Sequence, residues 1–267
     1  MQSHLIDDVT VYTEGSGEQT LLMLHGWPDS YRLWDSTVAA LKDRFECVRF
    51  SLPGFGDDQR TRPVVLAEMT DIILHIAEMV SPYKEITLLL HDWGCVFGFE
   101  FAAKHPDRVT RLVAVDIGDH NTGHFMRSLP AKAKWQIAAY QLPLALAWCI
   151  GKHISPGLGN WLTRWVAHAV QCPTPPEHIH WMQNYPYAMT WLGLAGGFKK
   201  AAKVKPRCPV LFIYGERKPF MFHSPQWLEQ LHTRPGSKVQ AFSTGHWVML
   251  EQPQAFVVCV RAWLPAA

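Results

Sequence analysis

Short apolar runs alternate with longer amphipathic stretches along most of the chain. The apolar runs predict buried strands at 20–24, 46–52, 85–91, 109–117, 208–214 and 237–242. These runs are apolar at successive positions rather than at every second one, which favours a parallel sheet covered on both faces. Helix-length patterns lie between them, at 31–41, 64–80, 93–104, 225–231 and 253–263. This alternation predicts the α/β class with right-handed crossovers.

One segment, residues 119–200, breaks this rhythm and is called the lid segment below. It contains no convincing strand, several Pro and Gly interruptions, and apolar residues at helical spacing, such as Trp161, Leu162 and Trp165. We expect a core domain formed by 1–118 and 201–267, and a helical cap inserted into it. Ligands of such sheets bind outside the carboxyl ends of the strands. The aromatic residues of the lid segment therefore either line a pocket or pack the segment onto the core.

Composition and charge narrow the classes of partner. The net charge of +2 over 267 residues gives no overall attraction to nucleic acid or to an anionic membrane. We expect neither a leader at the N-terminus nor membrane insertion, since the longest apolar stretch, 138–150, is interrupted by Gln141 and Pro143. The six cysteines lack metal-binding spacing, so we expect reduced thiols in a cytoplasmic protein without a metal or other cofactor.

The stretch LLLHDWGCVFG, residues 88–98, places a carboxylate inside an apolar run. Three leucines predict a buried strand, and Gly94 onward predicts the start of a helix, so Asp92 lies at a tight strand-to-helix corner. Burying a charge there is costly unless it is paired. Capping the following helix is the structural explanation for Asp92, and a role in chemistry is the other.

Four further fragments follow predicted strands: LHGWPDS at 24–30, SLPGFGDD at 51–58, VDIGDH at 115–120 and STGHWVMLEQP at 243–253. Together with LHDWGC they resemble the α/β-hydrolase fold family over nearly the whole chain. Within that family they are similar to the epoxide hydrolases and haloalkane dehalogenases, which carry an aspartate nucleophile. The resemblance implies a mostly parallel, twisted sheet flanked by helices, with a helical lid inserted after the sixth strand.

The resemblance also implies a reaction. At the nucleophile elbow of this fold one side chain is forced into the cavity, and Asp92 occupies that position. A carboxylate there attacks saturated carbon and forms an alkyl ester on the enzyme. His246 then activates the water that hydrolyses the ester. The backbone N–H groups of Trp27 and Trp93 stabilise the oxyanion.

The chain departs from the family pattern at the acid that should orient His246. The family often places this acid after the strand ending FIYGERK, where this chain has Lys218. We favour Asp116, at the end of the strand before the lid segment. Glu216 and Asp119 are the alternatives. A second departure is Leu90, where many members have glycine two residues before the nucleophile.

The leaving group distinguishes epoxide from halide chemistry. A ring-opened alkoxide needs a proton donor, and epoxide hydrolases use lid tyrosines, for which NYPYAMTW offers Tyr185 and Tyr187, with Tyr140 as a further candidate. A halide needs only N–H donors, such as the Trp93 indole. We expect an epoxide hydrolase acting on a small apolar organic substrate. A haloalkane dehalogenase and a non-catalytic ligand-binding protein are the alternatives, and the sequence does not predict an oligomeric state.

Overall fold

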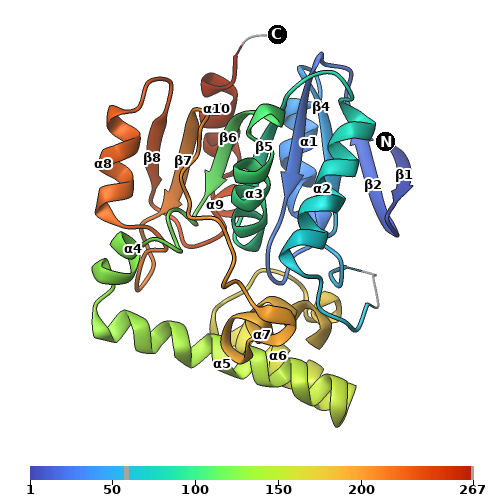
Figure 1. Ribbon diagram of the computed structural model, residues 1–267, viewed down its shortest axis with the longest axis vertical. Coiled ribbons are helices and arrows are strands. Elements are labelled where there is room, and N and C mark those ends of the chain that lie inside the picture. The colour runs from blue at the N-terminus through green and yellow to red at the C-terminus, as the bar shows by residue number, and fades with distance from the viewer. Residues whose placement is uncertain (57–59, 266–267) are drawn as a thin grey trace.

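The computed structural model describes residues 1–56 and 60–265. Its described residues contain an eight-stranded sheet in the order β1-β2-β4-β3-β5-β6-β7-β8 (Figure 1). From β3 to β8 neighbouring strands are parallel, and β2 joins the sheet antiparallel to β4. The strands are β1 (Gln2–Ile6), β2 (Val9–Glu14), β3 (Gln19–Leu24), β4 (Phe45–Phe50), β5 (Ile86–His91), β6 (Val109–Val115), β7 (Val210–Gly215) and β8 (Lys238–Phe242).

The predicted α/β class and mostly parallel sheet are confirmed, and all six predicted strands are present. The sequence pattern missed the antiparallel hairpin β1–β2. The residues of β1 are largely exposed, and β2 buries only every second residue, so neither forms the continuous apolar run that reveals an inner strand. Of the fragment at 51–58, the last two residues, Asp57 and Asp58, lie outside the described residues.

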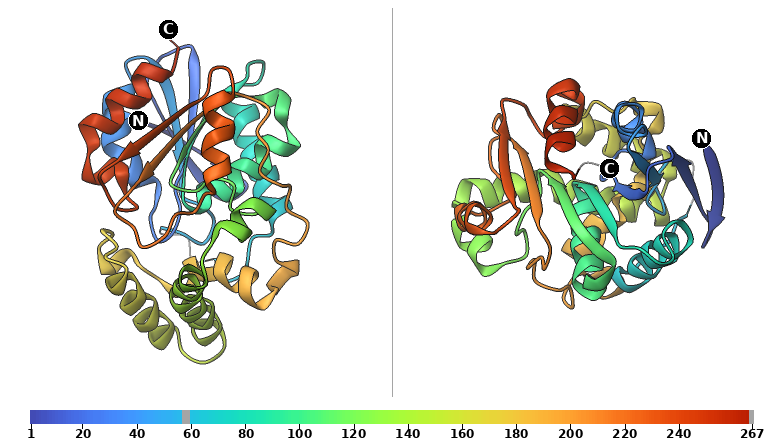
Figure 2. Two further views of the ribbon diagram at one scale, coloured as in Figure 1. Left: turned by 90° about the vertical axis from the view of Figure 1, so that its left-hand side faces the viewer. Right: turned by 90° about the horizontal axis from the view of Figure 1, so that it is seen from above.

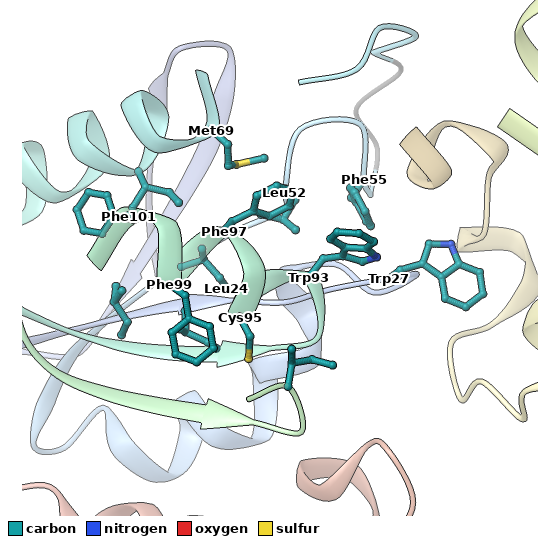
Figure 3. Close-up of a cluster of buried hydrophobic side chains, with 14 of the residues drawn as sticks. Leu24, Trp27, Leu52, Phe55, Met69, Trp93, Cys95, Phe97, Phe99 and Phe101 are labelled. Carbon is teal, nitrogen blue, oxygen red and sulfur yellow. The ribbon is translucent and has the colours of Figure 1, made fainter. Parts of the chain in front are cut away.

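Helices cover both faces of the sheet, and the core divides accordingly. Leu88 and Leu90 of β5 pack into one cluster with α2 (Leu66–Val80) and α3 (Trp93–Lys104). Leu89, between them, packs into the other cluster with α1 (Asp35–Leu41) and α10 (Pro253–Trp263). Figure 3 shows the first cluster around α3, with Trp27 and Trp93 at its border. A strand that is apolar at successive positions thus supplies both layers. The helices α8 (Pro225–Thr233) and α9 (Val248–Glu251) complete the C-terminal part.

Between β6 and β7 the described chain forms helices without a named strand. They are α4 (Gly123–Ser128), α5 (Ala131–His153), α6 (Pro156–Ala169) and α7 (Tyr185–Leu192), joined by turns and short 3-10 helices. Figures 1 and 2 show them gathered beyond one end of the sheet. Asp92, which follows β5, shares cavities with Tyr140 of α5 and Tyr187 of α7, so that end is the carboxyl end of the strands. Pro143 lies inside α5 without ending it.

Candidate active site

Asp92 joins β5 to α3 in an uncommon backbone conformation, with φ 51° and ψ −122°. Such a conformation typically costs about 1–3 kcal/mol in a residue other than glycine. Gly94 makes the corner possible, because a Cβ there would lie 2.3 Å from the carbonyl oxygen of Leu24. The Asp92 side chain does not cap α3; its Oδ1 accepts a hydrogen bond from the distant Trp27 N–H at 2.7 Å. Helix capping therefore does not explain the position of the Asp92 carboxylate.

Leu90, the second predicted departure from the family pattern, is accommodated by Gly98 of α3. A Cβ at Gly98 would lie 2.4 Å from Cδ2 of Leu90. Leu90 itself is completely buried. In this chain the small residue that permits the close approach of strand and helix is Gly98 on the helix.

The structure brings His246 between two carboxylates. Its Nε2 lies 3.6 Å from Oδ2 of Asp92, and its Nδ1 is hydrogen-bonded to Asp116. Asp116 follows β6 and is completely buried. His91 holds the backbone that carries His246, since its Nε2 donates to the backbone oxygen of His246 at 3.2 Å. Burial lowers the pKa of His91 to about 3, which keeps its ring neutral.

The two alternative acids do not take the place of Asp116. Glu216 is exposed to solvent, whereas the carboxylate in contact with His246 Nδ1 is that of the buried Asp116. Asp119 is buried but accepts hydrogen bonds from Ser224 N–H, Ser224 Oγ and Thr122 Oγ1, all at 2.7 Å. These contacts fix the chain where it enters the lid segment, which is a structural role.

Lys218 lies where the family often has its acid, and its ammonium group contacts the carboxylate of Asp116. The Lys218 side chain is only 8% exposed. Asp116 thus lies between two cationic partners, with a further hydrogen bond from the Gly215 N–H at 3.2 Å. Burial opposes the charge of Asp116, but Lys218 and His246 outweigh it and hold the pKa of this carboxyl well below its usual range.

The same charges set the protonation of the other two groups. Burial disfavours a charged imidazole, but the charge and hydrogen bond of Asp116, helped by Asp92, raise the pKa of His246 to about 9. Burial also disfavours a charged Asp92. The hydrogen bond and charge of His246, with the Trp27 N–H, nevertheless leave the pKa of Asp92 below its ordinary value. At neutral pH the site therefore holds an imidazolium between two carboxylates.

The predicted oxyanion donors flank the Asp92 carboxylate. Trp27 N–H already donates to it, and Trp93 N–H belongs to the first residue of α3, where amides lack intrahelical partners. His25 holds the turn that carries Trp27. Its Nε2 accepts from Leu52 N–H at 2.9 Å, so its Nδ1 donates to the Gly26 oxygen. Burial lowers the pKa of His25 to about 4, consistent with this neutral, structural role.

Two cavities, of about 550 and 420 Å³, lie beside Asp92. Both are lined by Asp92, Tyr140, Tyr187 and Phe222. Burial raises the pKa of both tyrosines above the ordinary value, so their hydroxyl groups stay protonated.

The structure places the two predicted tyrosines of α7 differently. Tyr185 is not among the described residues that line either cavity, and its ring packs edge-on against Phe55 at 6.0 Å. Residues two apart on a helix point in nearly opposite directions, so Tyr185 and Tyr187 cannot both face the carboxylate. Tyr140, from α5, lines both cavities together with Tyr187, and its hydroxyl oxygen accepts a hydrogen bond from Gln141 Nε2 at 2.8 Å.

A family model described as alpha/beta hydrolase fold matches residues 19–253. The chain belongs to this family. The match includes the elbow at Asp92, the strand end at Asp116 and the loop that carries His246.

Curated relatives of this hydrolase-fold chain include epoxide hydrolases. The chain is 34% identical over 107 residues to a soluble epoxide hydrolase of Corynebacterium sp. (strain C12), covering 39% of this chain and 36% of that protein. It is 24% identical over 270 residues to epoxide hydrolase 3 of Xenopus tropicalis, covering 91% and 71%. The chain spans only 21% to 36% of the length of several curated relatives that it matches.

Among solved structures, a mutant epoxide hydrolase from Bacillus megaterium in complex with its diol product has a TM-score of 0.71 to this chain. The two are 19% identical, and the comparison covers 98% of this chain and 99% of that one. At this identity the likeness establishes the fold.

Contacts that tie the lid segment to the hydrolase-fold core were not predicted. The Trp27 indole donates to Asn184 at 2.8 Å, and Thr174 donates to Asp29 at 2.6 Å. The Trp247 indole also donates to Asp29, at 3.0 Å. Burial raises the pKa of Asp29 to about 6. The sequence contained a clue, because Asp29 is the carboxylate of the LHGWPDS fragment.

The described residues contain no group of three or more side chains suited to hold a metal ion. None of the described helices is long and apolar enough to cross a membrane. All six cysteines are free, and Cys95, beside the elbow, is buried with its Sγ directed to the Val115 oxygen at 3.5 Å. Burial raises the pKa of the Cys95 thiol well above its usual value, so packing explains its presence.

Proposed function

We propose that this protein is an epoxide hydrolase that forms an alkyl ester on Asp92. One observation carries the proposal: Asp92, Tyr140 and Tyr187 line both cavities. An ionised carboxylate and two protonated phenols in one apolar site supply the nucleophile and the acid that opening an epoxide requires. The similarity to epoxide hydrolases supports the same choice.

In the first step an oxygen of Asp92 forms a bond to one carbon of the epoxide, and the bond from that carbon to the ring oxygen breaks. The ring oxygen takes the electron pair and a proton from Tyr140 or Tyr187. The lowered pKa of Asp92 keeps the nucleophile ionised without a base. Esterification removes one of the two negative charges that stabilise the His246 imidazolium. The pKa of His246 therefore falls, and its proton can return to the tyrosine.

In the second step neutral His246 accepts a proton from water as the water oxygen attacks Cγ of Asp92. The oxyanion that forms on Asp92 accepts hydrogen bonds from Trp27 and Trp93 N–H. Losing such a donor typically costs roughly 3–4 kcal/mol of barrier. The intermediate collapses by releasing the alcohol, which takes the proton from His246. Collapse leaves Asp92 as a carboxylic acid that carries the second proton of the water. This proton passes to His246, which restores the carboxylate and the imidazolium, and the net reaction is epoxide plus water giving a diol.

Halide chemistry uses the same Asp92 and His246, but the site favours it less. A halide would need the Trp93 indole as a donor. That indole ring packs edge-on against the Tyr187 ring, with the ring centroids 5.2 Å apart. A non-catalytic binding protein would have no need for the buried contact between Asp116 and His246. A screen of styrene oxide-type epoxides and short bromoalkanes separates these functions, because the products are a diol, a halide ion or neither.

Replacing Tyr140 and Tyr187 together with Phe tests the acid. The double variant should lose about 10²–10⁴-fold in kcat on epoxides, the usual contribution of a positioned general acid. Tyr185→Phe is the matched control, since it removes a buried hydroxyl of the same helix outside the cavities, and it should retain activity. Full activity in the double variant, measured as diol formation, would show that neither tyrosine donates the proton.

A further inference from the structure

The outward side of α5 and α6 is unusually apolar. Trp135, Trp161 and Trp165 are 77%, 63% and 56% exposed. Leu142 and Leu146 follow Trp135 at helical spacing on α5, and Leu158 precedes Trp161 and Trp165 at the same spacing on α6. The two helices pack against each other at the end of the molecule opposite the C-terminus (Figures 1 and 2). We call this surface the outer lid face; its exposed apolar residues are Trp135, Leu142, Leu146, Ile154, Leu158, Trp161 and Trp165.

The two helices carry basic side chains but no acidic ones. Residues 131–169, which form α5 and α6, contain no Asp or Glu, but do contain Lys132, Lys134, Lys152 and Arg164. Lys152 also lies over the Trp148 ring, with its Nζ 4.8 Å from the ring centroid, and Arg164 Nε donates to the Ile179 oxygen at 3.1 Å. The whole lid segment has seven Lys and Arg against two Asp and Glu, whereas the rest of the chain is net acidic. The near-neutral total charge is therefore the sum of a net positive charge on the lid segment and a net negative charge on the rest of the chain. The total charge alone does not reveal that the lid segment is basic.

The larger cavity reaches the surface beside this face. Met126 and Trp191 line the cavity and are 52% and 38% exposed. Lys134, next to Trp135 on α5, also lines it and is exposed. An apolar molecule held in a lipid layer against the outer lid face would thus have a short path to the cavity.

We propose that the outer lid face binds the surface of an anionic lipid bilayer. Tryptophan concentrates at the boundary between lipid headgroups and acyl chains, leucine and isoleucine insert below it, and lysine pairs with anionic headgroups. Pairing of this face with a second copy of itself would bring cations against cations, with no acidic residue on α5 or α6 to offset them. The lipid surface supplies the missing negative charge.

Co-flotation with vesicles tests the proposal without relying on any enzymatic activity. The intact protein should float with phosphatidylcholine vesicles that contain phosphatidylglycerol, and high salt or omission of phosphatidylglycerol should weaken binding. Lys132→Gln with Lys152→Gln should reduce the partition coefficient by about tenfold or more, because each basic residue near such a surface contributes about 1 kcal/mol. Trp161→Gln with Trp165→Gln should reduce it comparably.

The matched control is Tyr83→Gln with Val258→Gln, which removes side chains 96% and 66% exposed outside the lid segment and should leave binding unchanged. All variants should keep the far-ultraviolet dichroism spectrum, and the Trp161/Trp165 variant should hydrolyse a water-dissolved epoxide as the parent does. Absence of flotation with anionic vesicles, or equal losses in control and test variants, would overturn the proposal. The proposal would also be overturned if the parent protein were a dimer and the Trp161/Trp165 variant a monomer, because a second copy would then cover the outer lid face.

Discussion

At the scale of single residues, Asp116 and Lys218 show how this chain rearranges its site. The acid lies after β6 rather than after β7, and a lysine stands at the position after β7. In the mechanism that we propose, the contacts of Asp116 with Lys218 and His246 keep its carboxylate ionised while Asp92 is esterified and neutral. The lysine at a usual acid position is thus a positioning residue for Asp116.

Lys218→Met tests this role through pH dependence. Loss of the ammonium charge should stabilise the His246 imidazolium and raise the pKa of His246 in the ester intermediate. Since neutral His246 is the base, the rate of ester hydrolysis should need a higher pH to reach its plateau. Lys218→Arg keeps the charge and should keep the profile. Single-turnover rates across pH would contradict this role if Lys218→Met and the parent enzyme had identical profiles.

At the scale of elements, the exchange between Leu90 and Gly98 explains how β5 and α3 stay close. Gly98→Ala should destabilise the protein by about 1–3 kcal/mol, the usual cost of overpacking a core. The cost should shrink when Leu90→Ala is also present, because the two side chains compete for one space. Urea unfolding of the single and double variants measures the coupling, and strictly additive effects would show that the two positions do not compete.

Most elements were predictable from the sequence, for physical reasons. Inner strands such as β5 are buried on both sides and form continuous apolar runs, and α3 and α10 were predicted with their observed bounds. The hairpin β1–β2 gave no such signal, since its outer strand faces solvent. Within the site, Asp92 and His246 were located through the resemblance of LHDWGC and STGHWVMLEQP to α/β-hydrolase motifs. Which tyrosine of α7 faces the cavity depends, however, on the rotation of that helix about its axis, which the sequence does not specify. Tyr140 lines the same cavities from another helix, α5, and their packing is also not specified by a motif.

At the scale of the whole molecule, the buried Asp29 joins the lid segment to the core. Thr174→Val removes one of its hydrogen-bond donors. Asp29 has a pKa raised to about 6, so the folded state binds its proton more tightly than the unfolded state, and stability from this group falls as pH rises. The Thr174 hydrogen bond favours the ionised form of Asp29, which prevails above the pKa. The free energy of unfolding of the variant should therefore fall by about 1–3 kcal/mol at about pH 8, and by less at about pH 5, where Asp29 is mostly protonated. Unfolding at both pH values tests this, with the exposed Thr233→Val as control.

The central claim is that Asp92 becomes covalently bound to saturated carbon. His246→Gln should permit alkylation but block hydrolysis, so the ester should accumulate. Intact-protein mass spectrometry after incubation with an epoxide that the parent enzyme hydrolyses should show a mass increase equal to one epoxide, located by peptide mapping at Asp92. An unmodified mass under these conditions, or an adduct on another residue, would contradict the account.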